Sequence, residues 1–400
     1  MIPNIRHLEL FSAVSHHGSV SAAARALHLS QPAVTQAVAA MERAFDTRLL
    51  TRSARGVVLT AAGRITAVRV DRALAQLREA FLEISRISKL ERRPGLRAAT
   101  TARLAAIVAV AEEGGFSNAA RSAKASRATL HRTARHFERL LGVELFERTS
   151  HGVRATRESE RLVRRIRLAG AEVRQAHAEV AATLGAERGE TVIGAMPLAR
   201  SSLLPAAVLA VANTHPLHQI RLLDGPYETL LRELRDGRVD FLIGALRTSV
   251  PSDIVQEYLF DDPLAIILRS GHPLAAKTKR APSLTALGRY AWISPRKDSP
   301  LSKQFDDLMS RIPRRQSIAP IECNSLVAAR AILLASDRLM LLSRYQVGQD
   351  VATGQLTTLP HPLGEVMRPI GLSMRRDWLP THVQQDLLRE IRHRIPASTR

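Results

Sequence analysis

The stretch GSVSAAARALHLSQPAVTQAVAAMERAFDTRLLTRSARGVVLT, residues 18–60, returns 96 positions later as GGFSNAARSAKASRATLHRTARHFERLLGVELFERTSHGVRAT, residues 114–156. The longer segments 7–64 and 103–160 align at this offset without a gap. Each copy of an internal repeat forms one structural unit. Two copies are too few for a solenoid, so the sequence predicts a duplicated module followed by a different domain. Residues identical in both copies include Gly18, Ser21, Ala23, Ala24, Arg25, Ser30, Glu42, Arg43, Leu49, Arg52, Gly56, Val57 and Thr60.

Positive charge is concentrated in the repeated half. The chain has 400 residues, a length that allows two to three domains with hydrophobic cores of their own. Its net charge is +21. Residues 1–189 hold 31 lysines and arginines against 17 acidic residues, and the remainder holds 27 against 20. A GC-rich genome that prefers arginine explains part of this excess but not its asymmetry. The repeated half is therefore expected to bind a polyanion.

The cysteine count and the apolar segments indicate where the protein acts. Cys323 is the only cysteine, which excludes an internal disulfide, is typical of a reducing cytosol and favours a buried, inert thiol. The first 20 residues lack a signal-peptide core, and no stretch reaches the roughly 18 uninterrupted apolar residues of a membrane span. We expect a cytoplasmic protein without a membrane partner.

Motifs of enzyme chemistry are not found in the sequence. It contains no P-loop, dinucleotide fingerprint, zinc spacing or nucleophile elbow. His215 and His218 flank Pro216 and are better explained by a turn than by a metal site. We therefore expect no catalytic residues, no cofactor and no metal.

Each copy of the repeat has the pattern of a helix-turn-helix. In copy one a first helix ends at Gly18, and Ser21 is expected to cap a short helix over residues 22–27. Ser30 then caps a helix to about residue 44, with Pro32 in its first turn, where a missing N–H costs nothing. The last helix of such a plan enters the major groove of DNA.

A wing and a long helix follow each helix-turn-helix. Residues 49–52 and 57–59 form a hairpin that places Arg52 and Arg55 against the phosphate backbone, and Thr60 caps the long helix. Apolar residues spaced by three and four predict a coiled coil that makes dimers. We expect each long helix to pair with another chain. The seam residues are Leu74, Leu77, Phe81, Ile84 and Ser88 in copy one, and Leu162, Ile166, Ala169, Val173, Ala176 and Val180 in copy two.

Copy one resembles the DNA-binding domain of LysR-type transcriptional regulators. The resemblance rests on FSAV at 11–14, LSQPAVTQ at 29–36, LLTR at 49–52 and LTAAG at 59–63. It implies a bacterial, sequence-specific regulator that binds double-stranded promoter DNA and a small-molecule effector. It also implies a homodimer or homotetramer, and contact with RNA polymerase in an activator. A typical member has one such unit, so the extra 96 residues account for the unusual length.

The candidate DNA contacts lie at the start of each recognition helix and in each wing. Gln31 and Gln36 can pair with adenine edges, and Thr35 can reach a base or a phosphate. Ser30 is better explained as a cap, while Gln36, Arg52 and Arg148 could instead be solvated surface residues. The predicted set is Ser30, Gln31, Pro32, Thr35, Gln36, Arg52 and Arg55 in copy one, and Ser126, Arg127, Thr129, His131, Arg132 and Arg148 in copy two.

Copy two departs from the family pattern. Its recognition helix starts SRATLHR at 126–132, without Gln-Pro, and Thr156 is followed by RES rather than AAG. Two interpretations compete: a different DNA preference, or decay into a structural spacer. Arg127, His131, Arg132 and Arg135 keep the groove face cationic, which favours DNA contact.

Strands and helices alternate past residue 189, which predicts a mostly parallel sheet flanked by helices. Strands are expected at 191–195, 220–223, 241–244 and 263–268, and helices at 201–213, 228–236 and 381–395. LRDGRVDFLIG at 234–244, DPL at 262–264 and GHPLA at 271–275 resemble markers of the LysR effector domain. That resemblance implies a two-lobed, type 2 periplasmic-binding-protein-like domain. Lobe one takes residues 190–260 and the C-terminal segment, lobe two takes residues 263–355, and the ligand lies between them.

The candidate effector residues follow strands or begin helices, where ligands of open α/β sheets bind. Hydroxyls at helix starts suit a carboxylate such as an aromatic or sugar acid. Each serine could instead be a plain N-cap, and Arg296 a surface charge. The set is Ser201, Ser202, Leu246, Ser294, Arg296, Asn324 and Ser325.

The predicted fold class is α + α/β. It comprises two tandem winged helix-turn-helix domains at 1–64 and 97–160, linker helices at 65–96 and 161–188, and the effector domain at 189–396. A transcriptional regulator fits best. The alternatives are a sequence-tolerant architectural DNA-binding protein, which has no need of two lobes, and a solute-binding protein with accessory winged helices, which would carry an export signal.

Overall fold

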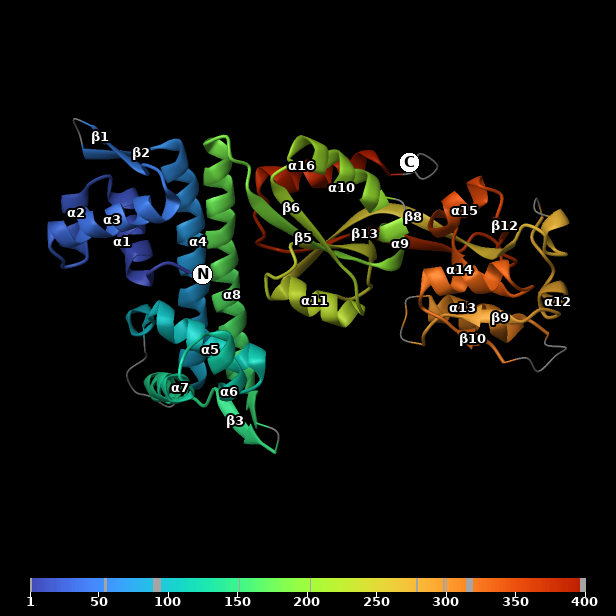
Figure 1. Cartoon of the computed structure of the whole chain (residues 1–400), viewed down its shortest axis with the longest axis horizontal. Coiled ribbons are helices and arrows are strands. Elements are labelled where there is room, and N and C mark those ends of the chain that lie inside the picture. The colour runs from blue at the N-terminus through green and yellow to red at the C-terminus, as the bar shows by residue number, and fades with distance from the viewer. Residues whose placement is uncertain are drawn as a thin grey trace. The chain divides into compact units, whose positions relative to one another are not determined.

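The computed structural model describes residues 2–53, 56–88, 95–150, 152–201, 203–277, 280–297, 299, 301–313 and 319–395. The chain divides into two compact units (Figure 1). The N-terminal unit consists of residues 1–190 with the short segments His215–Gln219 and Arg235–Arg238, and the C-terminal unit contains the rest.

Six elements in the N-terminal unit occur twice in the same order. We call the two sets the first and second winged units. The first comprises α1 (Ile5–His17), α2 (Val20–Ala26), α3 (Gln31–Phe45), β1 (Leu50–Ser53), β2 (Gly56–Leu59) and α4 (Ala61–Ile87). After the short helix η1 (Leu96–Ala98), the second comprises α5 (Thr101–Glu113), α6 (Phe116–Ser122), α7 (Arg127–Leu141), β3 (Phe146–Thr149), β4 (Gly152–Ala155) and α8 (Arg157–Thr183).

Side-chain caps set where the main helices begin. The hydroxyls of Ser30 and Ser126 accept hydrogen bonds from the third residue of α3 and α7, as expected. The prediction that Ser21 caps α2 is wrong. Ser19 does so, accepting from the Ala22 amide at 3.3 Å, because Ser19 has the extended backbone of an N-cap and the helix already begins at residue 20.

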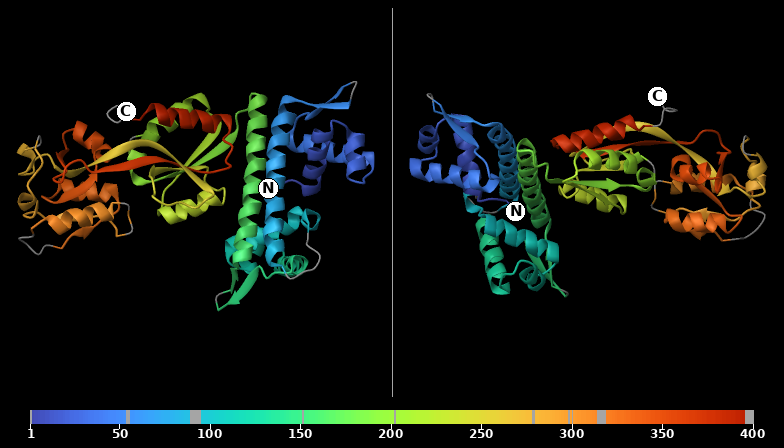
Figure 2. Two further views of the ribbon diagram at one scale, coloured as in Figure 1. Left: turned by 180° about the vertical axis from the view of Figure 1, so that it is seen from behind. Right: turned by 45° about the horizontal axis from the view of Figure 1, so that its top comes forward.

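The two longest helices, α4 and α8, pack along each other within the chain. They run antiparallel in every view (Figures 1 and 2). Leu74, Leu77, Ile84, Leu162 and Val173 are almost fully buried in a core shared by both helices. The prediction that each seam pairs with another chain is therefore wrong, because the two seams already cover one another.

The C-terminal unit is built on one mixed nine-stranded sheet. Its strand order is β10-β9-β11-β8-β13-β7-β5-β6, and β12 pairs with β8. The strands are β5 (Gly189–Ala195), β6 (His218–Leu223), β7 (Phe241–Ala245), β8 (Ile254–Arg269), β9 (Trp292–Ser294), β10 (Ile321–Glu322), β11 (Leu339–Ser343), β12 (Leu356–Pro360) and β13 (Met367–Arg375). β8 and β13 run antiparallel to their neighbours, so the sheet is less parallel than predicted.

Helices accompany this sheet in both halves of the unit. They are α9 (Pro197–Ser201), α10 (Leu203–Thr214), α11 (Tyr227–Arg235), η2 (Ala275–Lys277), α12 (Leu284–Leu287), α13 (Ser302–Arg311), α14 (Leu326–Leu334), η3 (Arg344–Val347), α15 (Gly348–Ala352) and α16 (His382–His393). Helix covers Leu203–Thr214 in the region where it was expected, and residue 202 lies outside the described residues. Within the described part of the chain, every helix is too short or too polar to cross a membrane.

Among its described residues the C-terminal unit has three hydrophobic cores, and two of them mark its two lobes. One runs from Ile193 to Phe260 and takes in α16, while the other runs from Leu264 to Leu359. The 16-residue strand β8 replaces the short strand expected at 263–268 and belongs to both cores. Because β8 and β13 are the strands that pass from lobe to lobe, they place any site between the lobes near residues 260–264 and 367–370.

Candidate nucleic-acid interface and effector site

The first recognition helix, α3, has a polar exposed face. Gln31, Pro32, Thr35 and Gln36 are exposed, whereas Val34, Ala37 and Val38 are buried in a cluster with residues of α1 and α2. Thr35 Oγ1 donates a hydrogen bond to the Gln31 carbonyl at 3.0 Å. Within the described residues the side-chain amides of Gln31 and Gln36 have no hydrogen-bond partner, so they remain free to pair with base edges.

The second recognition helix, α7, exposes the equivalent positions with different chemistry. Arg127, Ala128, His131 and Arg132 are exposed, over a buried face of Leu130, Ala134 and Phe137. Arg127 and Arg132 form no hydrogen bond or ion pair within the part of the chain that the structure describes. The His131 ring rests on Phe116 at 5.1 Å, and the Ser126 and Thr129 hydroxyls lie 2.8 Å apart. The face is therefore cationic and accessible.

Each wing carries one exposed arginine on its first strand. Arg52 pairs with Val57 across the first hairpin, and Arg148 with Val153 across the second. Among the described residues neither arginine makes an ion pair, which leaves both free for phosphate. Arg55, also predicted to contact DNA, lies outside the described residues.

Close backbone contact explains the glycine shared by both wings. Gly56 has φ +132°, and a Cβ atom there would lie 2.4 Å from the Gly18 carbonyl oxygen, which accepts a hydrogen bond from the Val57 amide at 2.9 Å. Gly152 has φ +137° and approaches the Gly114 carbonyl in the same way, at 3.2 Å. Only glycine fits such an approach at positive φ, so the wings are held against α1 and α5.

A recurring glutamate, given no role from the sequence, anchors each wing to its recognition helix. Glu42 Oε1 accepts from the Leu49 amide at 2.9 Å and the Leu50 amide at 3.3 Å. Glu138 Oε1 accepts from the Leu145 and Phe146 amides at 2.9 and 3.1 Å. The signal was present, because this glutamate is identical in both copies. These hydrogen bonds hold each wing against its recognition helix.

In the effector unit, three of the predicted residues come together at one sheet edge. Ser294 ends β9 and pairs with Glu322 of β10, and its carbonyl accepts from the Cys323 amide at 3.0 Å. Asn324 and Ser325 follow directly, and Ser325 caps α14 by accepting from the Ala328 amide at 3.3 Å. The N-terminus of α14 therefore lies beside the end of β9. Cys323 is half-exposed rather than buried as predicted.

The other predicted effector residues lie on separate segments of the effector unit. Arg296 lies two residues beyond β9, and the Leu246 amide, just after β7, donates to the Pro369 carbonyl at 2.8 Å. Ser201 is the last residue of α9, and only its backbone is described. Ser202 lies outside the described residues.

Family models and individual relatives match both parts of this arrangement. The model "LysR substrate binding domain" matches residues 184–396. The model "Bacterial regulatory helix-turn-helix protein, lysR family" matches twice, at residues 5–64 and 101–160. The chain is 32% identical to the HTH-type transcriptional regulator GalR of Pseudomonas putida over 395 residues, 98% of both chains. This chain belongs to the LysR family of bacterial transcriptional regulators.

Further relatives agree with this LysR assignment. PcaQ of Agrobacterium fabrum, an HTH-type transcriptional regulator, is 28% identical over 300 residues, which are 72% of this chain and 93% of PcaQ. In fold, the chain is similar to a full-length OxyR variant from Pseudomonas aeruginosa, with a TM-score of 0.54 at 22% identity over 72% of this chain and 93% of that one. CbnR, a LysR family regulator, gives 0.50 at 19% identity over 74% and 99%.

The family establishes what the LysR regulator does. It binds promoter DNA through helix-turn-helix structure and controls transcription in response to a small-molecule effector. LysR regulators act as oligomers, and they are not enzymes.

An arginine that sequence reasoning missed lies beside predicted Leu246 in the effector unit of this LysR regulator. Arg247 stacks on the ring of Tyr227, with its guanidinium carbon 4.2 Å from the ring centroid. Burial raises the pKa of Tyr227, so its phenol stays protonated. The available signal was an arginine two residues past β7, at a strand end where ligands bind. Arg247 supplies a positive charge suited to an anionic effector.

A buried ionic cluster lies where β8 and β13 pass between the lobes. Asp262 is fully buried, accepts from Ser343 Oγ at 2.5 Å and pairs with Arg368 Nη2 at 2.5 Å. Burial raises the pKa of Asp262, and Arg368 and Ser343 offset part of that rise. Residues on β8, β11 and β13 thus meet at one carboxylate. This contact connects β8 and β13, which pass between the lobes, to β11 of lobe two.

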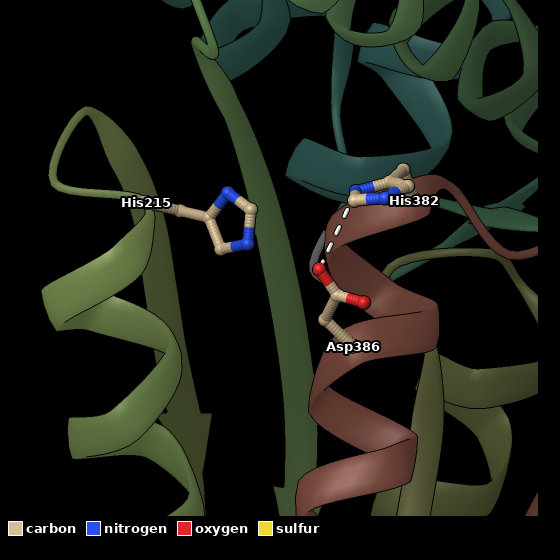
Figure 3. Close-up of side chains that lie close together, drawn as sticks. All are labelled: His215, His382 and Asp386. Carbon is tan, nitrogen blue, oxygen red and sulfur yellow. Dashed lines mark ion pairs between the residues drawn. The ribbon is translucent and has the colours of Figure 1, made fainter.

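Two histidines, His382 and His215, each form an ion pair with a carboxylate. His382 Nδ1 lies 3.4 Å from Asp386 one helical turn away (Figure 3), which is an ordinary pair on a helix surface. His215, drawn in the same figure, pairs with Glu187 at 2.5 Å. Its carbonyl accepts from the His218 amide at 3.0 Å, which confirms the predicted turn.

Proposed function

We propose that this regulator reads its promoter with both winged units, a duplicated DNA-binding module. The observation that carries the proposal is the exposed, unpaired face of α7, on which Arg127 and Arg132 have no protein partner among the described residues. A structural spacer has no need of such a face. Base contacts are assigned to Gln31, Pro32, Thr35 and Gln36 on α3, and to Arg127, Thr129, His131 and Arg132 on α7. Ser30 and Ser126 present helix N-termini to phosphate, and Arg52, Arg55 and Arg148 hold the backbone.

The effector is proposed to be a small carboxylated molecule bound between the two lobes. Ser294, Asn324 and Ser325 cluster at the N-terminus of α14, whose dipole favours an anion. Arg247 adds a positive charge near Leu246, and Ser201, Ser202 and Arg296 complete the candidate set. An effector changes DNA binding only if it favours one lobe arrangement over another. The lobes are proposed to move like those of the periplasmic binding proteins they resemble.

The assembly is proposed to be a homodimer or homotetramer in the cytoplasm, where promoter DNA is found. Because α4 and α8 cover one another, contacts between chains are assigned to other surfaces, including the effector domain. RNA polymerase is the further partner if the regulator activates transcription. The domain limits proposed from the sequence, 1–64, 65–96, 97–160, 161–188 and 189–396, are kept.

DNA binding is tested by fluorescence anisotropy with the full-length protein, its own upstream DNA and a scrambled duplex. We expect preference for the upstream DNA, and at least a tenfold loss in the Arg127→Ala/Arg132→Ala double variant. The matched control is Arg78→Ala/Arg174→Ala, which removes the same charge from exposed positions of α4 and α8. Equal binding of scrambled DNA would contradict the function, and an unaffected double variant would contradict the role of α7.

Effector binding is tested by thermal shift with a panel of aromatic and sugar acids and their neutral amides. We expect acids, and not amides, to raise the melting temperature, and Asn324→Ala/Arg247→Ala to abolish the rise. Ser283→Ala is the control, because Ser283 caps α12 through the Ala286 amide at 3.2 Å, away from the candidate residues in sequence. Stabilisation by the amides alone would contradict a carboxylate site.

A further inference from the structure

The two winged units contact each other through ion pairs that occur in equivalent sets. In one set the first copy of the repeat supplies the arginine, and in the other the second copy does. Arg69 Nε donates to Glu179 Oε2 at 2.8 Å, and Arg165 Nη2 donates to Glu83 Oε1 at 2.6 Å. Arg165 is the repeat equivalent of Arg69, and Glu179 is that of Glu83, each 96 residues later. The second contact is therefore the first with the two copies exchanged.

A second set of contacts obeys the same exchange. Arg69 Nη1 donates to Glu172 Oε2 at 2.9 Å, and Arg165 Nη1 donates to Gln76 Oε1 at 2.8 Å. Gln76 is the repeat equivalent of Glu172. When residue i contacts j and the equivalent of j contacts the equivalent of i, the interface is isologous and has a two-fold axis. The N-terminal unit is thus a two-fold pair made from one chain.

Aromatic contacts repeat this exchange at the level of whole helices, between each long helix and the recognition helix of the other copy, through partners, Phe45 and Phe137, that are not repeat equivalents. His177 of α8 stacks on Phe45 at the end of α3, with ring centroids 4.0 Å apart. Its equivalent in α4, Phe81, meets Phe137 of α7 edge to face at 6.2 Å. Each long helix therefore holds the recognition helix of the other copy, and the two wings lie at opposite ends of the α4–α8 pair (Figures 1 and 2).

The two recognition helices of this pair, α3 and α7, differ in their exposed side chains. In a homodimer identical readers face a palindromic operator. Here Gln31, Pro32, Thr35 and Gln36 are replaced by Arg127, Ala128, His131 and Arg132. Glutamine pairs with the N6 and N7 edge of adenine, whereas arginine pairs with the O6 and N7 edge of guanine. The same scaffold therefore presents adenine-reading chemistry on one side and guanine-reading chemistry on the other.

We propose that a single chain carries a complete reading pair and recognises an asymmetric operator, with adenines under α3 and guanines under α7. This inference rests on the proposed DNA contact by both winged units. Because the two half-sites differ, each chain binds in one orientation, so the operator gives the bound regulator a direction along the promoter.

Selection from a random duplex library by the full-length protein tests the asymmetry. We expect enriched sequences with two unlike halves at a fixed separation. The variant R127Q/H131T/R132Q gives α7 the polar side chains of α3, and we expect it to select two alike, adenine-bearing halves in inverted orientation. Its reciprocal, Q31R/T35H/Q36R, should select guanine-bearing halves on both sides. Selection of a palindrome by the unaltered protein would overturn the inference.

Mixing two disabled chains tests whether the pair belongs to one chain. One chain carries Arg127→Ala/Arg132→Ala, the other Gln31→Ala/Gln36→Ala, and the two are co-expressed so that mixed oligomers form. We expect specific binding to remain at least tenfold weaker than that of the unaltered protein. Restored binding would mean that readers from different chains cooperate, and would overturn the inference.

Different outcomes separate this inference from the proposed function. If the unaltered protein selects no sequence at all, the DNA-reading function itself fails. If it selects one half-site, and the α7 variants leave that site and its affinity unchanged, the second winged unit does not read DNA and both proposals for α7 fail. A specific palindrome leaves DNA reading intact and removes only the asymmetry.

Discussion

The first and second winged units share a scaffold and differ in the surface that it presents. Residues that build the scaffold are identical in both: the helix caps Ser30 and Ser126, the wing anchors Glu42 and Glu138, and the wing glycines described above. The four exposed positions in the first six residues of the recognition helix all differ. Preserved geometry with altered side chains is what a change of DNA preference requires.

The ion pairs between the first and second winged units are also only partly symmetric. Removing them is expected to give the largest change in stability. The Arg69 side chain is 1% exposed, whereas that of its equivalent Arg165 is 27% exposed. Burial alone would lower the pKa of Arg69, but the hydrogen bonds to Glu179 and Glu172 outweigh it and raise that pKa. Arg69→Met removes the arginine that pairs with Glu179 and one of the two arginines, Arg69 and Arg72, that pair with Glu172, and breaking such a buried cluster costs about 3–5 kcal/mol. Arg165→Met should cost about 1 kcal/mol.

Urea unfolding followed by circular dichroism compares these two variants. The relevant quantity is the midpoint of the transition that belongs to the N-terminal unit, because a chain with two units need not unfold in one step. Equal losses for Arg69→Met and Arg165→Met would show that the interface is symmetric in energy as well as in geometry.

Removing the wing anchors should have the next largest effect. Each glutamate carboxylate accepts two backbone N–H bonds, and hydrogen bonds to charged groups contribute about 1.5–3 kcal/mol each. We expect about 3 kcal/mol for Glu138→Ala, which is buried, and about 1.5 kcal/mol for half-buried Glu42→Ala. Hydrogen exchange should accelerate at the Leu145 and Phe146 amides in the first variant, and at Leu49 and Leu50 in the second. Unchanged protection would refute the anchoring role.

The wing arginines should change the salt dependence of DNA binding. If both wings hold phosphate, Arg52→Ala and Arg148→Ala should each lower the slope of log affinity against log salt by about 1 without altering sequence preference. Arg78→Ala on exposed α4 is the control. A loss confined to Arg52→Ala would show that only the first wing grips DNA.

The smallest expected effect is on the pH dependence of stability. It arises at His177, where the first winged unit has Phe81. Burial lowers the pKa of His177 below its ordinary value of 6.5, so the folded unit holds this ring neutral against Phe45. The unfolded chain binds the proton more readily, so the stability from neutral His177 is complete above pH 6.5 and falls as pH drops toward the lowered pKa. His177→Phe, which copies Phe81, should weaken this dependence.

Urea midpoints between pH 7.5 and 5.5 measure that change. Burial also lowers the pKa of His7, so a residual slope should persist in the His177→Phe variant. An identical slope with and without His177 would assign the pH dependence to other groups.

Local signals in the sequence predicted much of the N-terminal unit. Ser30 and Thr60 are caps where expected, and α3 ends within one residue of its predicted limit, because caps and periodicity are local properties. The partner of α4 could not be predicted in this way. An apolar seam shows that a helix needs a partner, and it does not distinguish a second chain from residue 162 onward of the same one.

The effector site was less accessible to sequence reasoning because its parts come from distant strands. Ser294 and Asn324 are 30 residues apart and meet only because β9 and β10 pair in parallel. Arg247 gains its meaning from the ring of Tyr227, a contact that no periodicity encodes. Long strands such as β8 also mask where one lobe ends, since the strand belongs to both cores.

The pairing of α4 with α8 inside one chain also removes a dependence on abundance. Dimers of separate subunits come apart on dilution, so their DNA-reading form is scarce when few molecules are present. Helices that belong to one chain meet at an effective concentration that does not fall with the number of molecules in the cell. A regulator assembled in this way keeps its reading surface whole even when the cell makes only a few copies of it.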